Sequence, residues 1–172
     1  AENGYHQAQK SKIAKKAGVA DGTIYLYFKS KEEILISVFR EKMGAFIRHL
    51  AIGITQKQTA SEKLFMLIEN HFQTFTDDYH LAIVTQLELR QSNKELRMKI
   101  KNVLKDYLDL IDKIIRKGIE QGEFSNQLDS RLARQMIFGT MDETVTTWVM
   151  NEQKYDLVAL APAVHKLLLN GC

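Results

Sequence analysis

The segment Lys10–Lys31 contains two short helical patterns joined at a glycine, Gly18. In the first pattern, Ile13, Ala14 and Ala17 fall on one face at helical spacing. Gly18 follows directly, in the place where a left-handed residue commonly ends a helix. The chain then has only a few residues in which to turn before the second pattern begins. Two short helices joined by so tight a turn predict a helix-turn-helix.

The second pattern has one apolar stripe and leaves its other face for a partner. Ile24 and Phe28 share the stripe at i, i+4, Val19 is expected to fill the corner, and Asp21 is expected to cap the helix. The opposite face, at about 100° per residue, is formed by Gly22, Thr23, Tyr25, Leu26 and Lys29. Such a face suits the major groove of DNA, because glycine allows close approach, threonine offers a hydroxyl, and leucine can contact a thymine methyl group.

Basic and hydroxyl groups at the rim of this motif suit phosphate contacts, which set the register on DNA. Lysines on short helices also occur on solvated faces, and a Tyr-x-Tyr-Phe run is often part of a core. The combination of basic groups, a short turn and an apolar plug at the offsets of one motif favours DNA binding. The expected DNA-binding residues are Lys10, Ser11, Lys12, Asp21, Gly22, Thr23, Tyr25, Leu26, Tyr27, Lys29 and Lys31.

The positive charge of the chain is concentrated in this N-terminal segment. Residues 1–42 hold eight Lys and Arg against five Asp and Glu, whereas the rest of the chain holds sixteen of each, so the net +3 lies here. This asymmetry favours nucleic acid over a membrane surface as the partner. No apolar run reaches the roughly 20 residues that span a bilayer, and no secretory signal is visible, so we expect a cytoplasmic protein. The single cysteine, Cys172, gives no intrachain disulfide to expect.

Beyond Lys29 the sequence predicts a series of amphipathic helices, several of them opened by Ser or Thr with Glu three residues later. A chain that is 45% hydrophobic with one proline fits an all-α fold with a substantial core. Pro162 is expected to bend the last helix. The expected domains are 1–45, for DNA binding, and 46–172, for ligand binding and dimerisation. The predicted helices run approximately over Ser30–Thr55, Thr59–Asp77, Tyr79–Gln91, Ser92–Gln121, Asp129–Asn151 and Asp156–Leu169.

The segment Gln135–Met150 is apolar or small on nearly every side. A helix of this kind is buried on more than one face. One face would meet the protein's own core, and the same helix of a second copy most simply accounts for the other, since two-fold dimers predominate among oligomers. A two-fold dimer also suits a palindromic operator. The expected interface residues are Met136, Thr140, Thr144, Thr147, Trp148, Val164 and Leu168.

Two further patterns predict a ligand site in the C-terminal domain. Aromatic and apolar residues at helical spacing can line a large cavity, although each one taken singly is more often plain core. Basic residues follow at i, i+4 and i+8 beside a predicted helix start, although such a stripe is often only a solvated face. Together they fit a fatty acyl chain with a phosphorylated head group. The expected ligand-binding residues are Phe72, Phe75, Leu87, Arg90, Arg97, Lys101, Lys105, Tyr107, Phe138 and Met141.

The N-terminal motif resembles the DNA-binding domain of TetR-family transcriptional regulators. The resemblance implies a helix before Gly4, and because the sequence opens at Ala1 without Met, we expect that helix to be incomplete here. It also implies that the last two helices, Asp129–Asn151 and Asp156–Leu169, form a four-helix dimer interface. The matching residues are Gly4, Tyr5, Ile13, Ala14, Ala17 to Val19, Gly22, Thr23, Tyr25, Tyr27, Phe28, Lys29, Lys31 and Glu32.

Gln86–Arg97 and Arg131–Met150 are similar to the fatty-acid-degradation repressors of Gram-positive bacteria within that family. This resemblance implies a repressor of β-oxidation genes that leaves its palindromic operator DNA when long-chain acyl-CoA binds the C-terminal domain. It also implies a homodimer, with acyl-CoA as the effector and no cofactor. We infer from charge and position alone that four basic residues contact the CoA phosphates. They are Arg90, Arg97, Lys101 and Lys105.

Two other functions are alternatives to this one. For an enzyme the sequence offers no nucleophile elbow, P-loop or H-E-x-x-H motif, and no catalytic residue or metal ligand is expected. A repressor of a drug-efflux gene would bind lipophilic cations through carboxylates beside aromatic rings, and Asp142 and Glu143 are the candidates for that role. The histidines fall at no metal-ligand spacing; they are His6, His49, His71, His80 and His165.

Overall fold

The computed structural model describes residues 9–88 and 94–170, and every regular element in those ranges is helical, as predicted. The elements are α2 (Lys10–Lys16), α3 (Asp21–Tyr27), α4 (Lys31–Thr55), α5 (Ala60–Asp77), α6 (Tyr79–Ile83), the π-helical turn η1 (Val84–Glu88), α7 (Lys94–Glu120), α8 (Ser130–Met150), the 3-10 turn η2 (Val158–Leu160) and α9 (Ala161–Asn170).

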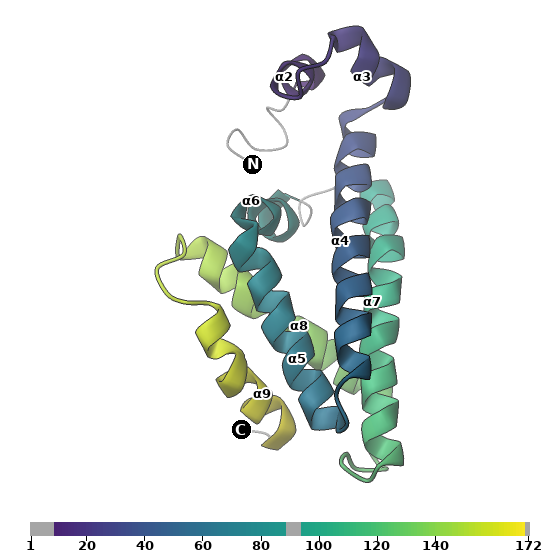
Figure 1. Ribbon diagram of the computed structural model, residues 1–172, viewed down its shortest axis with the longest axis vertical. Helices are drawn as coiled ribbons and strands as arrows, with labels where there is room; N and C mark the ends of the chain where they lie inside the picture. The colour runs from purple at the N-terminus through teal and green to yellow at the C-terminus, as the bar shows by residue number, and fades with distance from the viewer. Residues whose placement is uncertain (1–8, 89–93, 171–172) are drawn as a thin grey trace.

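Helix α4 connects two parts of very different size (Figure 1). The short helices α2 and α3 pack on each other at one end of the molecule. From there α4 runs along α7 into a bundle in which α5 packs on α4, α7 and α9, and α8 packs on α7. A helix of 25 residues is about 37 Å long, so one rigid element reaches from the small unit through the bundle.

Three helices begin where the sequence predicts. The Ser30 hydroxyl accepts a hydrogen bond from the backbone N–H of Glu33, and Asp129 accepts one from Leu132 in the same way at α8. Thr59 forms a complete capping box at α5. Such caps need only side chains within one turn of the helix start, which is why the local sequence reveals them.

The end of α2 also follows the prediction. Gly18 has φ +70°, and the backbone N–H groups of Gly18 and Val19 donate to the carbonyl oxygens of Lys15 and Ala14. This pair of bonds is the Schellman arrangement, which needs a left-handed residue at Gly18.

Two expectations for the corner between α2 and α3 were wrong. The N-cap of α3 is Ala20, with no side-chain hydrogen bond, and Asp21 is already the first helical residue. Its carboxylate therefore contributes only charge at the positive end of the helix dipole. Val19 is 40% exposed and does not fill the corner.

The last helix also differs from its prediction. Instead of a bent helix from Asp156, a 3-10 turn precedes α9, which begins at Ala161. Pro162 lies in the first turn of α9, where its missing N–H breaks no intrahelical bond, so it causes no bend. The helix expected from Tyr79 is α-helical to Ile83 and π-helical to Glu88. Its expected end at Gln91 and the expected start of α7 at Ser92 lie outside the described residues.

The hydrophobic core lies in the C-terminal bundle. Its largest fully buried side chains include Trp148, Tyr107 and Phe72, from α8, α7 and α5. No helix in the described ranges is long and apolar enough to cross a membrane.

Candidate functional site

Helix α3 presents large apolar side chains to solvent. Tyr25, Leu26 and Tyr27 are 55%, 84% and 76% exposed, while Ile24 alone is buried in this helix. A Cβ added at Gly22 would meet nothing within 4 Å, so packing does not require glycine there. Three exposed apolar residues on a seven-residue helix form a surface suited to a partner.

Several of the other predicted DNA-binding residues lie in α3 itself, in α2 or just after α3. Asp21, Lys12 and Lys29 are exposed, while Ser11, Thr23 and Lys31 are half-buried. Lys29 also ties α3 to α4, because its backbone N–H donates to the Glu33 carboxylate at 2.7 Å.

Lys10 has an internal role in addition to its charge. Its Nζ lies 4.0 Å from the centre of the Tyr25 ring and donates a hydrogen bond to the Lys29 carbonyl oxygen at 2.9 Å. These contacts hold the start of α2 against the second half of α3 and the segment that follows it. Lys10 therefore orients Tyr25, and phosphate binding is not needed to explain its place.

A cavity of about 330 Å³ lies within the C-terminal bundle, between α4, α5, η1, α7 and α8. Its wall is mainly apolar, and Arg97 and Lys101 of α7 line it while remaining exposed to solvent. A pocket of this volume is at the small end of the usual range for small-molecule sites. The lining residues are Phe39, His71, Phe75, Thr85, Gln86, Arg97, Ile100, Lys101, Leu104, Leu108, Phe138 and Asp142.

The cavity joins four of the predicted ligand residues, namely Phe75, Arg97, Lys101 and Phe138. Phe72, Tyr107 and Met141 are fully buried and do not line the cavity, so their prediction as lining residues is corrected: they are core. Leu87 is half-buried against that core. Arg90 lies outside the described residues.

Lys105 is exposed and does not line the cavity, so two of the three residues of the predicted basic stripe on α7, Arg97 and Lys101, lie there. Each step of four residues turns a helix by about 40° beyond a full circle. Two such steps from Arg97 carry Lys105 around the helix and away from the cavity.

Polar groups brought from distant elements hold one wall of the cavity. The Gln86 amide nitrogen donates to the Asp142 carboxylate at 3.0 Å, and the Thr146 hydroxyl donates to the Gln86 amide oxygen at 2.9 Å. Gln86 is only 3% exposed. The bonds fix η1 to α8. Sequence reasoning missed Gln86, and its only signal was a polar residue within an apolar helical pattern.

A second polar pair lies deeper in the bundle. The Tyr107 hydroxyl is 3.0 Å from Nδ1 of His71, and the two rings are stacked at 5.8 Å. Burial lowers the pKa of His71 to about 3, so its ring is neutral at physiological pH. His71 lines the cavity.

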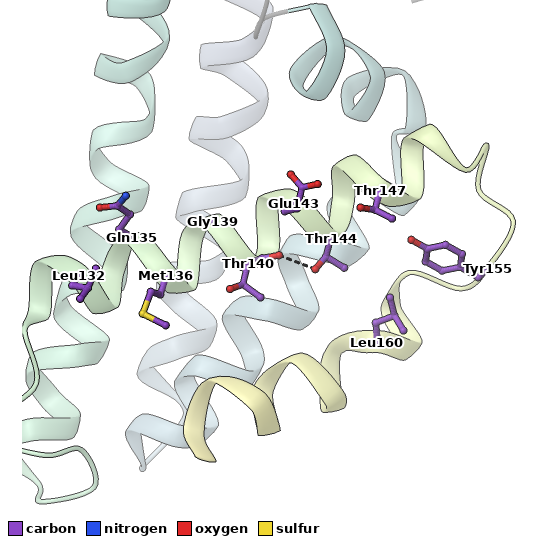
Figure 2. A pocket seen from close by; sticks show the side chains of 10 residues that line it. All are labelled: Leu132, Gln135, Met136, Gly139, Thr140, Glu143, Thr144, Thr147, Tyr155 and Leu160. Atoms are coloured by element: carbon purple, nitrogen blue, oxygen red, sulfur yellow. Dashed lines mark hydrogen bonds between the residues drawn. The ribbon is translucent and has the colours of Figure 1, made fainter. Parts of the chain in front are cut away.

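A surface groove of about 720 Å³ runs between α8 and the segment before α9 (Figure 2). Four of the predicted interface residues line it, namely Met136, Thr140, Thr144 and Thr147, and Glu143 is on the same face. Leu132 and Met136 are 54% and 58% exposed there. The groove is therefore a largely apolar surface that none of residues 9–88 and 94–170 covers.

Trp148 and Val164 are removed from the predicted interface. They are 2% and 8% exposed and lie in the core of this chain, where a second copy could not reach them. The Trp148 indole N–H donates to the Tyr155 carbonyl oxygen at 2.9 Å and so holds the segment after α8. Leu168 is half-buried and does not line the groove. Helical periodicity alone could not tell the core-facing side from the outer side.

No group of three or more His, Cys, Asp or Glu side chains is placed to hold a metal ion within residues 9–88 and 94–170. The chemical groups at the cavity are thus the cations of Arg97 and Lys101, the amide of Gln86 with the Asp142 carboxylate to which it donates, the Thr85 hydroxyl, a neutral imidazole and apolar carbon. These can bind an amphipathic anion, with the apolar part inside and the charge at Arg97 and Lys101.

Comparison with known proteins matches both parts of the chain to known family profiles. The family profile described as bacterial regulatory proteins, tetR family, matches residues 1–38, and the profile described as YsiA-like protein, C-terminal region, matches residues 39–171. The fatty acid metabolism regulator protein of Bacillus subtilis (strain 168) is 66% identical over 171 residues, which cover 99% of this chain and 88% of the relative.

Two solved structures are similar throughout. FadR from Bacillus subtilis in complex with stearoyl-CoA has a TM-score of 0.98 at 65% identity, covering 100% of this chain and 92% of that one. The fatty acid degradation regulator FadR from Bacillus halodurans has a TM-score of 0.96 at 60% identity, covering 99% and 88%. The two family profiles and the close relative show that the chain belongs to the TetR family of bacterial regulatory proteins.

Proposed function

We propose that this chain is a transcriptional repressor of fatty-acid degradation genes that leaves its operator DNA when long-chain acyl-CoA binds the C-terminal cavity. The observation that carries the proposal is the cavity itself, which combines an apolar wall with Arg97 and Lys101 at the solvent side. The stearoyl-CoA bound by the similar Bacillus subtilis protein supports the same ligand class. The proposal places the protein in the cytoplasm, with its DNA, and assigns it no catalysis.

On the DNA side, α3 would lie in the major groove with its exposed face toward the bases. Gly22, Thr23, Tyr25 and Leu26 would approach the base edges. Tyr27, Ser11 and the lysines around the motif would contact the phosphates, which supply affinity and salt dependence. Lys10 would act mainly by holding Tyr25 in place.

We propose a homodimer through the groove on α8. The groove carries exposed Leu132 and Met136, small polar side chains, and Gly139, where an added Cβ would meet nothing. A second copy of the same helix would cover this face by two-fold symmetry. Two recognition helices in one dimer would then read the halves of a palindromic operator.

The cavity has two routes to the DNA-binding unit. Phe39 of α4 lines the cavity directly, and α4 begins next to α3. The second route passes through η1 and α6 to Asp78, whose carboxylate accepts from the Leu81 backbone N–H and pairs with Lys42 of α4 at 3.0 Å. A ligand that displaces the cavity wall would therefore shift α4 and change the spacing of the recognition helices.

The electrostatics of Asp78 fit this role. Partial burial raises its pKa, but the bonds from Lys42 and Leu81 outweigh that effect, so the pKa is lowered overall and the group stays ionised. The ligand must bind one dimer geometry more tightly than the other, since equal affinity would shift nothing. A tenfold loss of DNA affinity corresponds to about 1.4 kcal/mol.

The drug-efflux alternative receives less support. Asp142 lines the cavity but accepts a hydrogen bond from Gln86, and Glu143 lies on the groove instead. The two carboxylates proposed for a lipophilic cation therefore belong to different surfaces. The cations at the cavity favour an anionic ligand.

The test is a titration of operator binding with three competitors. The full-length protein would first select a palindromic operator from a random DNA pool. Stearoyl-CoA, stearate and CoA would then be added separately while binding is followed by fluorescence anisotropy. We expect release by stearoyl-CoA alone. Stable DNA binding in the presence of all three would refute the effector assignment and leave the family assignment intact.

A further inference from the structure

His71 presents an unpaired polar atom among aromatic side chains in the wall of the cavity. Its side chain is 5% exposed, and edge-on contacts from the rings of Phe72 and Phe75 surround it. Its Nε2 atom has no hydrogen-bond partner in the part of the chain that the structure describes. A buried polar group without a partner is costly, and native proteins keep one mainly where a ligand or another group completes it.

The Tyr107 hydroxyl determines which ring nitrogen carries the proton. Burial raises the pKa of Tyr107, with a smaller contribution from Asp142, so the hydroxyl keeps its hydrogen. This hydroxyl lies 3.0 Å from Nδ1 of His71, and we infer that it donates its hydrogen to that nitrogen. The imidazole is itself neutral, because burial lowers the pKa of His71 to about 3. With Nδ1 accepting, the single ring proton is on Nε2, and the unpaired atom is a donor.

The position of this donor suits a ligand anchored at the mouth of the cavity. His71 lines the same cavity as Arg97 and Lys101, and it stacks on Tyr107, which shares helix α7 with them. Tyr107 follows Arg97 by ten residues, which is about 15 Å along a helix. In an acyl-CoA, a long flexible arm separates the phosphates from the thioester. Phosphates at Arg97 therefore leave the thioester within reach of the interior.

We propose that the Nε2–H of His71 donates a hydrogen bond to the thioester carbonyl oxygen of the bound acyl-CoA. This inference rests on the proposed function, because it takes acyl-CoA as the ligand of the cavity. The bond makes His71 a specificity-determining residue. A long-chain lipid without a carbonyl at this depth leaves the donor unpaired, and that penalty is the source of discrimination.

The same site disfavours a free fatty acid. A neutral imidazole supplies no positive charge, and the carboxylate of a fatty acid at this depth would be buried without a counter-ion. A thioester carbonyl is uncharged and needs only one donor. The Tyr107–His71 pair thereby selects the activated form of the fatty acid over the acid itself.

The test compares stearoyl-CoA with S-octadecyl-CoA, a thioether that has the same chain and head group but lacks the carbonyl oxygen. Binding to the full-length protein is measured by isothermal titration calorimetry. We expect wild-type protein to bind stearoyl-CoA about fivefold more tightly, the range expected of one hydrogen bond. In the double variant His71→Phe/Tyr107→Phe the ratio should fall to about one.

The double variant removes both partners of the buried bond and leaves no new unpaired group, so it is expected to fold. Its DNA binding without ligand provides the check on folding. Phe138→Leu is the matched control, because it alters an apolar part of the same wall. It should weaken both ligands alike and keep the fivefold ratio.

Equal binding of the two ligands to wild-type protein would overturn the inference and leave the proposed effector intact. A ratio that persists in the double variant would also overturn it. If the double variant lost affinity equally for both ligands, His71 and Tyr107 would contact a part of CoA that the two ligands share, and the thioester assignment would be overturned. Failure of wild-type protein to bind either ligand would refute the proposed function, and the inference with it.

Discussion

The two ends of α4 present opposite ways of building a binding site. In α2 and α3 only Ala14 and Ile24 are buried, and the large side chains of Tyr25, Leu26 and Tyr27 face solvent. In the bundle the largest side chains, among them Trp148, Tyr107 and Phe72, are buried, and the cavity lies against that core. A change in the recognition unit should therefore alter DNA binding with little effect on stability, whereas a change near the cavity affects stability and ligand binding together.

The largest expected effect tests this contrast with a pair of truncations. Phe72→Ala empties a fully buried site and should lower the free energy of unfolding by about 3–5 kcal/mol. Leu26→Ala removes an 84% exposed side chain and should change the free energy of unfolding by less than about 0.5 kcal/mol. Urea denaturation measures both. Leu26→Ala should instead weaken operator binding by about tenfold. A similar loss of stability in the two variants would remove the contrast.

The next largest effect is on the pH dependence of stability, and it arises from His71 in the bundle. The folded protein takes up a proton at His71 near pH 3, whereas the unfolded chain does so near pH 6.5. Stability from this group is therefore complete above pH 6.5 and decreases as the pH falls toward 3. Between pH 7 and pH 5 the loss should be about 2 kcal/mol. His71→Phe/Tyr107→Phe should lack this part of the pH dependence in denaturation curves, and an unchanged slope would contradict the neutral buried ring.

A third prediction separates the two residues of the basic stripe that line the cavity from the third, Lys105, which does not. Arg97→Ala/Lys101→Ala should weaken stearoyl-CoA binding by about tenfold, since charge-assisted bonds to the phosphates are lost. Lys105→Ala, the matched control outside the cavity, should bind normally. Titration calorimetry gives both values. Comparable losses in the two proteins would mean that the head group binds a broad charged surface.

The smallest expected effect lies in the connection between the two regions. Asp78→Asn removes the ion pair with Lys42 but keeps a side chain that can accept at the start of α6. Because this pair is at the surface, stability should change by no more than about 1 kcal/mol. DNA binding and acyl-CoA binding should each persist, while the release of DNA by acyl-CoA becomes weaker. Full release in this variant would show that Phe39 alone carries the signal.

A feature of this structure could be predicted from the sequence when the interacting residues lie close together along the chain. The caps at Ser30, Thr59 and Asp129 and the end of α2 at Gly18 depend on side chains within one turn, and the sequence predicted them. Asp21 has the residue type of a cap, but it lies one position inside the helix. Residue type alone does not determine the exact start of a helix.

The cavity and the groove could be predicted only in part. The bond between Gln86 and Asp142 joins residues 56 positions apart, so no local pattern reports it. Trp148 and Thr147 are adjacent on a helix that is apolar or small all round, yet one is buried and the other faces the groove. Which side of such a helix meets the core depends on how the other helices pack.

The central claim is that the cavity and the recognition helices are linked, and thermodynamic reciprocity tests it most directly. The measurement is the dissociation constant of stearoyl-CoA for the free protein and for the protein saturated with operator DNA. Our account predicts that operator DNA weakens stearoyl-CoA binding by the same factor by which stearoyl-CoA weakens DNA binding. Equal affinity for stearoyl-CoA in the two states would contradict it.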